Sequence, residues 1–379
     1  MPKKILVSVV MPCLNEEKTV GLCVQKAKIG LRQAGVSGEV VVSDNGSTDS
    51  SVRVAQAVGA RIVIARARGY GAALLAGIIS AKGDWIVMGD SDNTYDFRQI
   101  KRLIAPLKSG YHLVIGSRLS GTVKKGAMPF LNRILGTPTL NLFLKLFYGL
   151  KISDSQSGMR AFTKVAFKKL KLKALGMEFA SEMLVRAKQK NLRLAEVPVS
   201  YGKRIMPTKL SRFRDAWRHL RFMLVFAPTY VFLGPGVFLF LLGAVGLVLL
   251  SGGPFWFLGR SWDVHTQILA SMLTILGSQV VMMGIFAKAF SWTQGFEDKD
   301  LFLAKTLRFF KLEQGLFLGL VLFLVGLIIG LLTYWDWAKA GFGFLWAIRP
   351  LVLAMTFAVL GMEIVFASFF LSILGIERK

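Results

Sequence analysis

Residues 4–12 read KILVSVVMP, an apolar run rich in β-branched side chains that predicts a buried first strand. Residues from about 16 to 34 follow with apolar side chains at helical spacing, which predicts a helix. Further apolar runs that predict strands, with helical segments between them, lie at 39–44, 61–65, 85–90 and 112–117. This alternation predicts an α/β domain with a mostly parallel sheet.

Polar residues follow several of these strands. Asn15 precedes the first helix as a candidate N-cap, with Glu16 and Glu17 near the positive end of the helix dipole. Ligands of parallel sheets bind beyond the carboxyl ends of the strands. The polar residues expected at that edge are Asn15, Glu16, Asp44, Asp90 and Asp92.

The sequence Asp90-Ser91-Asp92 places two carboxylates one residue apart at the end of an apolar strand. Such a pair can hold a divalent cation between itself and a diphosphate, and hard oxygen ligands suit Mg²⁺ or Mn²⁺. A surface turn explains most Asp-x-Asp sequences, but the position after a strand favours metal binding here.

Glycines at 69, 71 and 77, in RGYGAALLAG, resemble a dinucleotide-binding loop only superficially. Such a loop normally follows the first strand, where this chain has MPCLNEE. We therefore expect these glycines to begin a helix or to allow close packing, and we disfavour a hydride-transfer enzyme.

The composition points to a membrane protein rather than a nucleic-acid-binding one. The chain has 379 residues, 53% of them hydrophobic, and a formal net charge of +26. Because the apolar residues concentrate after residue 228, the positive charge is better matched to anionic lipid and phosphate than to nucleic acid. Cys13 and Cys23 predict neither a disulfide framework nor a zinc site.

Four segments are long and apolar enough to span a membrane, at about 229–251, 264–291, 314–335 and 347–374. The loop between the second and third spans and the C-terminal tail carry most of the flanking Lys and Arg residues. By the positive-inside rule, and because no signal peptide precedes the first strand, the head and both termini are expected in the cytoplasm. Glu363 falls within the fourth span, where a carboxyl is a candidate functional group. We favour the alternative that it is protonated, or hydrogen-bonded to polar groups such as Ser278 or Gln279.

Two further segments are predicted to lie at the membrane interface. Residues 207–228 interleave arginines with Phe, Trp and Leu just before the first span, as in a basic amphipathic helix. Residues 129–150 share this character, although either segment could instead pack on the head. The predicted domains are thus a head at 1–206, a juxtamembrane helix at 207–228 and a membrane domain at 229–379.

The head resembles glycosyltransferase family 2, which has a GT-A nucleotide-sugar fold, and most closely its polyprenyl-phosphate branch, which includes dolichol-phosphate mannose synthases. The segments that carry the resemblance span nearly the whole head in the family's order. They are VVMPCLNEEKTV, VVSDNGSTDSS, ARGYGAALLAGI, GDSDNTYDF, IGSRL, SDSQSGMRAF, MEFASEM and EVPVSYGKRIMPTKLS.

The resemblance implies roles for individual residues. The residues that would bind the nucleotide sugar are Pro12, Asn15, Glu16, Asp44, Asp90, Ser91 and Asp92, with Asp90 and Asp92 also holding Mg²⁺ or Mn²⁺. Those assigned to catalysis are Asp92, Arg118, Asp154 and Arg204, and those assigned to the lipid phosphate are Arg133, Thr137, Arg160, Arg204 and Lys209. Arg160 has the alternative of pairing structurally with Asp154.

Two residues depart from the family pattern. Thr94 stands where mannose synthases often have a metal-binding Gln, so the third metal ligand and mannose as the sugar are both open. Pro207 replaces the usual Gly before the Ser-Lys pair.

The reaction implied is attack of a polyprenyl phosphate on the anomeric carbon of a UDP- or GDP-linked sugar, with inversion. The competing interpretations are a processive polysaccharide synthase, disfavoured because no QxxRW sequence is present, and a non-catalytic membrane scaffold. The four spans could bury part of the lipid, mediate homo-oligomerisation or serve only as an anchor.

Overall fold

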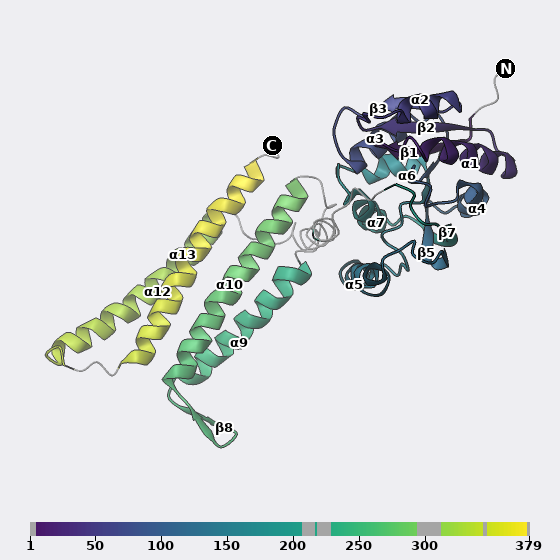
Figure 1. The fold of residues 1–379 in the computed structure, drawn as a ribbon. Helices are drawn as coiled ribbons and strands as arrows, with labels where there is room; N and C mark the ends of the chain where they lie inside the picture. Colours follow the sequence, from purple (N-terminus) through teal and green to yellow (C-terminus); the bar gives the residue numbers. More distant parts are fainter. Residues whose placement is uncertain (1–4, 207–216, 218–228, 294–311, 344–346, 377–379) are drawn as a thin grey trace. The chain divides into compact units, whose positions relative to one another are not determined.

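A computed structural model describes residues 5–206, 217, 229–293, 312–343 and 347–376. The chain divides into two compact units, Met1–Met223 and Leu224–Lys379. Figure 1 shows the first unit as a sheet covered by helices and the second as long helices.

The first unit is built on a seven-stranded sheet of order β3-β2-β1-β4-β6-β5-β7. The strands are β1 (Val7–Cys13), β2 (Gly38–Asp44), β3 (Arg61–Ile64), β4 (Trp85–Met88), β5 (Leu113–Val123), β6 (Arg160–Thr163) and β7 (Leu194–Tyr201). Only β6 runs antiparallel to its neighbours, β4 and β5, so the expected α/β fold with a mostly parallel sheet is confirmed. The sequence did not predict β6, because its four residues are too few to show a strand period.

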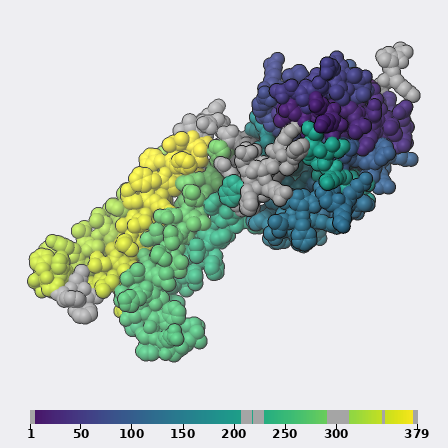
Figure 2. All heavy atoms as spheres, viewed as in Figure 1, coloured from purple at the N-terminus to yellow at the C-terminus, as the bar shows by residue number. Residues whose placement is uncertain are grey.

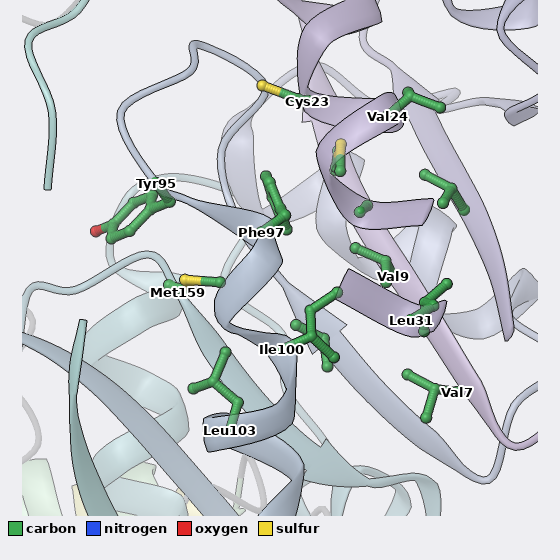
Figure 3. Close-up of a cluster of buried hydrophobic side chains, with 14 of the residues drawn as sticks. Val7, Val9, Cys23, Val24, Leu31, Tyr95, Phe97, Ile100, Leu103 and Met159 are labelled. Carbon is green, nitrogen blue, oxygen red and sulfur yellow. The ribbon is translucent and has the colours of Figure 1, made fainter. Parts of the chain in front are cut away.

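Helices cover both faces of this sheet. They are α1 (Val20–Gln33), α2 (Ser51–Ala57), α3 (Tyr70–Ser80), α4 (Ile100–Lys108), α5 (Thr137–Tyr148), α6 (Lys164–Leu170) and α7 (Phe179–Gln189), with a 3₁₀ turn at Phe97–Gln99 and a π-turn at Asn132–Gly136. Alternate residues of β1 enter opposite cores. Val9 lies in one core with Leu31 of α1 and Ile100 of α4, as Figure 3 shows, whereas Val10 lies in the other core with residues of α3 and α7. The parallel pairing of β1 with β2 and β4 brings the carboxyl ends of these three strands to one edge of the sheet.

The first helix begins four residues later than the sequence predicted. Its N-cap is Thr19, and α1 starts at Val20. Asn15 is not the N-cap: it adopts a left-handed conformation, with φ 49°, and its side-chain oxygen accepts a hydrogen bond from the Thr48 N–H at 2.7 Å. Asn15 therefore ties the β1–α1 loop to the loop after β2 rather than satisfying a helix end.

Among its described residues, the second unit contains four helices that are long and apolar enough to cross a membrane. These spans are Thr229–Ser251, Val264–Phe290, Leu312–Lys339 and Ile348–Leu374, which fall on the predicted ranges. The first span consists of a π-turn at Thr229–Leu233 followed by α9 (Gly234–Ser251). The other three lie in α10 (Val264–Thr293), α12 (Leu312–Lys339) and α13 (Ile348–Ile376). Between α9 and α10 the chain forms a β-hairpin of β8 (Phe255–Phe257) and β9 (Arg260–Trp262).

Glycines allow the helices of each hairpin to approach closely. A Cβ added at Gly236 of α9 would lie 2.8 Å from the Val281 nitrogen of α10. A Cβ at Gly319 of α12 would lie 2.7 Å from the Gly361 oxygen of α13. Small residues are the usual means of close helix packing in lipid.

Polar pairs join α10 to α13. The hydroxyls of Ser271 and Thr356 share a hydrogen bond of 2.7 Å, and Ser278 donates one of 2.6 Å to Glu363. The second bond confirms the expected partner of Glu363. Both pairs are 85 residues apart along the chain, so the two helices run parallel to one another.

Candidate active site

A cavity of about 500 Å³ lies at the carboxyl ends of β1 and β4. Its lining includes seven of the predicted site residues, namely Pro12, Glu16, Asp90, Ser91, Asp92, Arg118 and Arg204. β1 and β4 pair in parallel up to Val10 and Met88, so the loops that follow them emerge side by side. The Ser91 hydroxyl strengthens this junction by donating a hydrogen bond of 2.7 Å to the Pro12 carbonyl.

The two carboxylates of the Asp-x-Asp sequence have different environments. Asp90 accepts a hydrogen bond of 2.9 Å from the Tyr70 hydroxyl, at the start of α3. Burial raises the pKa of Asp90 above its usual range, and repulsion from Asp92 is the second cause. Asp92 is 6% exposed and accepts hydrogen bonds through one oxygen from the backbone N–H and the hydroxyl of Thr94, at 3.0 and 2.6 Å.

Arg204 bridges the first and fourth strand ends. Its Nη2 lies 2.5 Å from Glu16 Oε1, and its Nη1 lies 3.2 Å from Asp92 Oδ2. Its Nε is buried and has no hydrogen-bond partner within the described part of the chain. A guanidinium held by two carboxylates at the cavity wall is placed to meet an anionic ligand.

Arg118 is held by Asp154. The Nε and Nη2 atoms of Arg118 lie 2.8 and 2.7 Å from the two oxygens of Asp154, which also accepts the Arg118 backbone N–H. The Tyr201 ring centroid lies 5.2 Å from the guanidinium carbon. Asp154 itself is fully buried and does not line the cavity. The structure thus corrects the expectation for Asp154: it positions Arg118 and does not face a reacting group.

Arg160 is not where a lipid phosphate could reach it. The side chain is fully buried, and its three guanidinium nitrogens donate to the backbone carbonyls of Ser157, Ala180 and Ser155 at 3.0, 2.6 and 2.8 Å. Burial lowers the pKa of Arg160 to about 10. Arg160 organises the turn before β6, and its pairing alternative with Asp154 is also wrong, since Asp154 pairs with Arg118.

Asp44 and Asn15 lie next to the cavity but outside its lining, and both hold the loop after β2. The Asp44 carboxylate accepts the backbone N–H groups of Gly46 and Ser47, at 2.9 Å and 3.2 Å. Neither Asp44 nor Asn15 belongs to the cavity lining, whereas Asn45 does. Asp44 and Asn15 therefore shape the loop that borders the cavity and do not form the cavity wall.

The predicted lipid-phosphate residues are dispersed. Arg133 is exposed in the π-turn before α5, whereas Thr137 is 5% exposed at the start of that helix. Burial places Thr137 out of reach of a lipid phosphate, contrary to its predicted role. Lys209 and the predicted helix at 207–228, apart from Trp217, lie outside the described residues.

The segment around α5 divides its apolar side chains between core and solvent. Leu144 is fully buried in the core, while Phe130, Leu131 and Leu135 are 73, 67 and 64% exposed. The segment 129–150 thus combines the two alternatives left open by the sequence, since it packs on the head and also presents apolar side chains outward.

Known proteins with similar sequences identify the family. The family model "Glycosyl transferase family 2" matches residues 8–171, and "Glycosyltransferase family 2 C-terminal transmembrane region" matches residues 285–375. The low-salt glycan biosynthesis hexosyltransferase Agl6 of Haloferax volcanii is 39% identical over 370 residues, which cover 97% of this chain and 89% of the relative. The chain belongs to glycosyltransferase family 2.

Two further comparisons found similar proteins. A dolichyl-phosphate hexose transferase of Haloferax volcanii is 30% identical over 208 residues, covering 54% of this chain and 87% of that protein. Glucosyl-3-phosphoglycerate synthase from Mycobacterium tuberculosis has 24% identity and a TM-score of 0.47, over 58% of this chain and 79% of the other.

Several side chains that line the site of this glycosyltransferase were not predicted from the sequence. They are Tyr70, Tyr95, Gln156, Met177 and Tyr201. Tyr70 stands in the RGYG sequence and Tyr201 ends β7, so both fell within quoted segments without being assigned a role. Their contribution depends on α3 and β7 reaching the same edge of the sheet.

The residues at the cavity fit a divalent cation in part. Asp90 and Asp92 supply hard oxygen ligands, which suit Mg²⁺ or Mn²⁺. A Cβ at Gly158 would lie 2.8 Å from Asp90 Oδ2, so this glycine keeps the second oxygen of Asp90 accessible. Within the described residues no group of three His, Cys, Asp or Glu side chains forms a ready metal cluster.

Proposed function

We propose that this glycosyltransferase transfers a single hexose from a UDP- or GDP-linked sugar to a polyprenyl phosphate, with inversion at the anomeric carbon. The observation that carries the proposal is the charge arrangement of one cavity, where Asp90 and Asp92 share the lining with Arg118 and Arg204. The name of the dolichyl-phosphate hexose transferase relative supports this class of acceptor.

In this proposal Asp90 and Asp92 hold Mg²⁺ or Mn²⁺, which would neutralise charge on the departing diphosphate. Glu16, Ser91 and Pro12 border the donor from the β1 and β4 sides, as their places in the lining suggest. Asn15 and Asp44 act one step further away, by fixing the loop through the contacts described above.

The chain's own task in the reaction is to align two anions. A phosphate monoester loses its second proton near pH 6, so the acceptor oxygen is already anionic and needs little help from a general base. Arg118 has its Nε and Nη2 occupied by Asp154, which fixes the plane of the guanidinium at the cavity wall. Arg204 offers the second guanidinium, and together they offset the repulsion between acceptor and donor phosphates.

The acceptor is membrane-bound, so we propose that the apolar side chains around α5 meet the bilayer. Arg133 stands among the exposed Phe130, Leu131 and Leu135, where a cation could contact a lipid phosphate. In the same proposal the head (1–206), the basic segment (207–228) and both termini lie on the cytoplasmic side, and the four spans lie in the membrane. The reaction itself does not require a homo-oligomer.

The test is turnover by the purified full chain with polyprenyl phosphate, Mg²⁺ and a panel of labelled UDP- and GDP-hexoses. We expect one donor to give a lipid carrying a single sugar, and no product when a chelator removes the cation. A long polymer would instead indicate a processive synthase. Failure of every donor, with the protein folded and inserted in the membrane, would contradict the proposal.

A further inference from the structure

The β8–β9 hairpin exposes an unusual amount of apolar surface. Trp256 is 72% exposed, Phe257 54% and Leu258 81%, the last being the highest value among the exposed large apolar side chains. Figure 2 shows the hairpin as a separate lobe at one end of the membrane unit. Apolar area of this size is costly to leave in water, so some apolar environment must cover it.

The backbone at the tip of the hairpin gives a second, independent indication that its apolar side chain has a role. Leu258 and Gly259 form a two-residue loop in which both residues have positive φ, 53° and 71°. Such loops favour Asn-Gly or Gly-Gly, because a residue with a Cβ and no polar side chain is strained in this conformation. Leucine at the first position is therefore poorly suited to this backbone conformation. Its presence is better explained by a role of its exposed apolar side chain.

Chain continuity indicates what covers the hairpin. Only residues 252–254 separate the end of α9 from β8, and only Asp263 separates β9 from α10. Three extended residues reach about 10 Å, so the base of the hairpin stays near the level where the two helices end. At that level a bilayer presents its lipid–water interface, where aromatic side chains concentrate.

The other connection at this end of the membrane unit has the same character. Because α10 and α13 run parallel, the segments that precede them lie at the same end of the unit. Tyr334 and Trp335, near the end of α12, are 55 and 60% exposed, and Phe342 in the α12–α13 connection is 55% exposed. Aromatic side chains thus occur in both connections, as in an interfacial belt.

The hairpin also satisfies part of its own polar backbone, on the edges where β8 and β9 face each other. β8 and β9 pair with each other, and the Trp262 indole N–H donates a hydrogen bond of 3.2 Å to the Phe257 carbonyl. The pairing register puts Arg260 opposite Phe257 on one face of the ribbon, where a guanidinium can meet headgroup phosphates.

We propose that the β8–β9 hairpin is a membrane anchor, whose Leu258 tip and aromatic side chains lie in the lipid–water interface at this end of the membrane unit. The proposal depends on α9 and α10 crossing the membrane and not on the transferase reaction. A failed turnover assay would leave it standing, and its own failure would leave the reaction unaffected.

The test places an environment-sensitive fluorophore at Leu258→Cys in the full chain, reconstituted in vesicles of phosphatidylcholine and phosphatidylglycerol. We expect blue-shifted emission, quenching by lipids with a spin label near the headgroup, and at least threefold weaker quenching by iodide than at a water-exposed site. Val165→Cys on α6, 66% exposed, is the aqueous control, and Ile328→Cys within α12, 54% exposed, is the deep control.

Two results would overturn the proposal. Full iodide quenching at position 258 would place the tip in water, and protection from iodide without spin-label quenching would place it against protein, such as a second copy. A second variant, Leu258→Asn, removes the apolar side chain at the tip and preserves the turn, because asparagine tolerates the left-handed backbone conformation. With the fluorophore at Ser261→Cys, Leu258→Asn should restore iodide quenching, and an unchanged signal would remove the role assigned to Leu258.

Discussion

Asp154 holds Arg118 side-on through two hydrogen bonds of 2.8 and 2.7 Å, and the carboxylate is wholly buried while the arginine reaches the cavity. Asp154 thus influences the cavity only through Arg118. This arrangement separates a residue that positions from a residue that contacts a ligand.

Replacing Asp154 by Asn should cost about 3–5 kcal/mol of unfolding free energy, because it leaves Arg118 without its anionic partner in a buried place. The matched control is Asp96→Asn, since Asp96 forms a similar two-bond pair with Arg98 at the surface and should cost at most about 1 kcal/mol. Unfolding in detergent would measure both. Equal losses would show that burial of the Arg118 pair has no energetic weight.

In the turnover assay, Asp154→Asn and Arg118→Lys should not be additive. Since Asp154 acts through Arg118, the double variant is expected to have nearly the activity of the Arg118→Lys variant alone. Values of kcat/KM for the four proteins of the cycle would measure the coupling. Independent effects that multiply would assign Asp154 a separate contact with substrate.

Asp92→Asn should nearly abolish turnover and reduce Mn²⁺ binding, while insertion in the membrane stays normal. The expected loss is at least about a hundredfold, since one of two cation ligands becomes neutral. Mn²⁺ titration by electron paramagnetic resonance gives a readout that does not depend on activity. Normal Mn²⁺ affinity in this variant would remove Asp92 from the cation site.

Gly158→Ala should weaken Mn²⁺ binding, because the new Cβ would lie 2.8 Å from Asp90 Oδ2 and 3.2 Å from the Tyr70 hydroxyl. Either the carboxylate or the tyrosine must move. Gly202→Ala is the control, since a Cβ there would meet only the Thr94 and Asn93 carbonyls at 3.6 and 3.8 Å. We expect a measurable change in affinity for the first variant only, and equal affinities would show that Asp90 tolerates the displacement.

Cys13 and Cys23 should resist thiol reagents in the native protein at pH 8. Both are free and buried, and burial is the main reason that the pKa of Cys13 is raised and that of Cys23 reaches about 12. A raised pKa keeps each thiol protonated at pH 8, and only the thiolate reacts quickly. Mass spectrometry after maleimide treatment should find no label until denaturant is added, and rapid labelling without denaturant would contradict the burial.

The sequence predicted the strand alternation and the edge at which Asp90 and Asp92 lie, because both follow from local apolar patterns. It also predicted Ser278 as a partner of Glu363, since few polar groups share that depth. It could not predict that Arg160 is sealed among backbone carbonyls, because an arginine in a motif looks the same whether buried or exposed. The partner of Asp154 was equally hidden, since it depends on how β5 and the loop before β6 meet.

The shared offset of 85 residues in the Ser271–Thr356 and Ser278–Glu363 pairs has a consequence for how the chain can vary. A residue added to the connection between α10 and α13 leaves both pairs in register. A residue added within α13 between Thr356 and Glu363 would rotate Glu363 by about 100° away from Ser278. Loop length is therefore free to drift, whereas the length of these two helices is not.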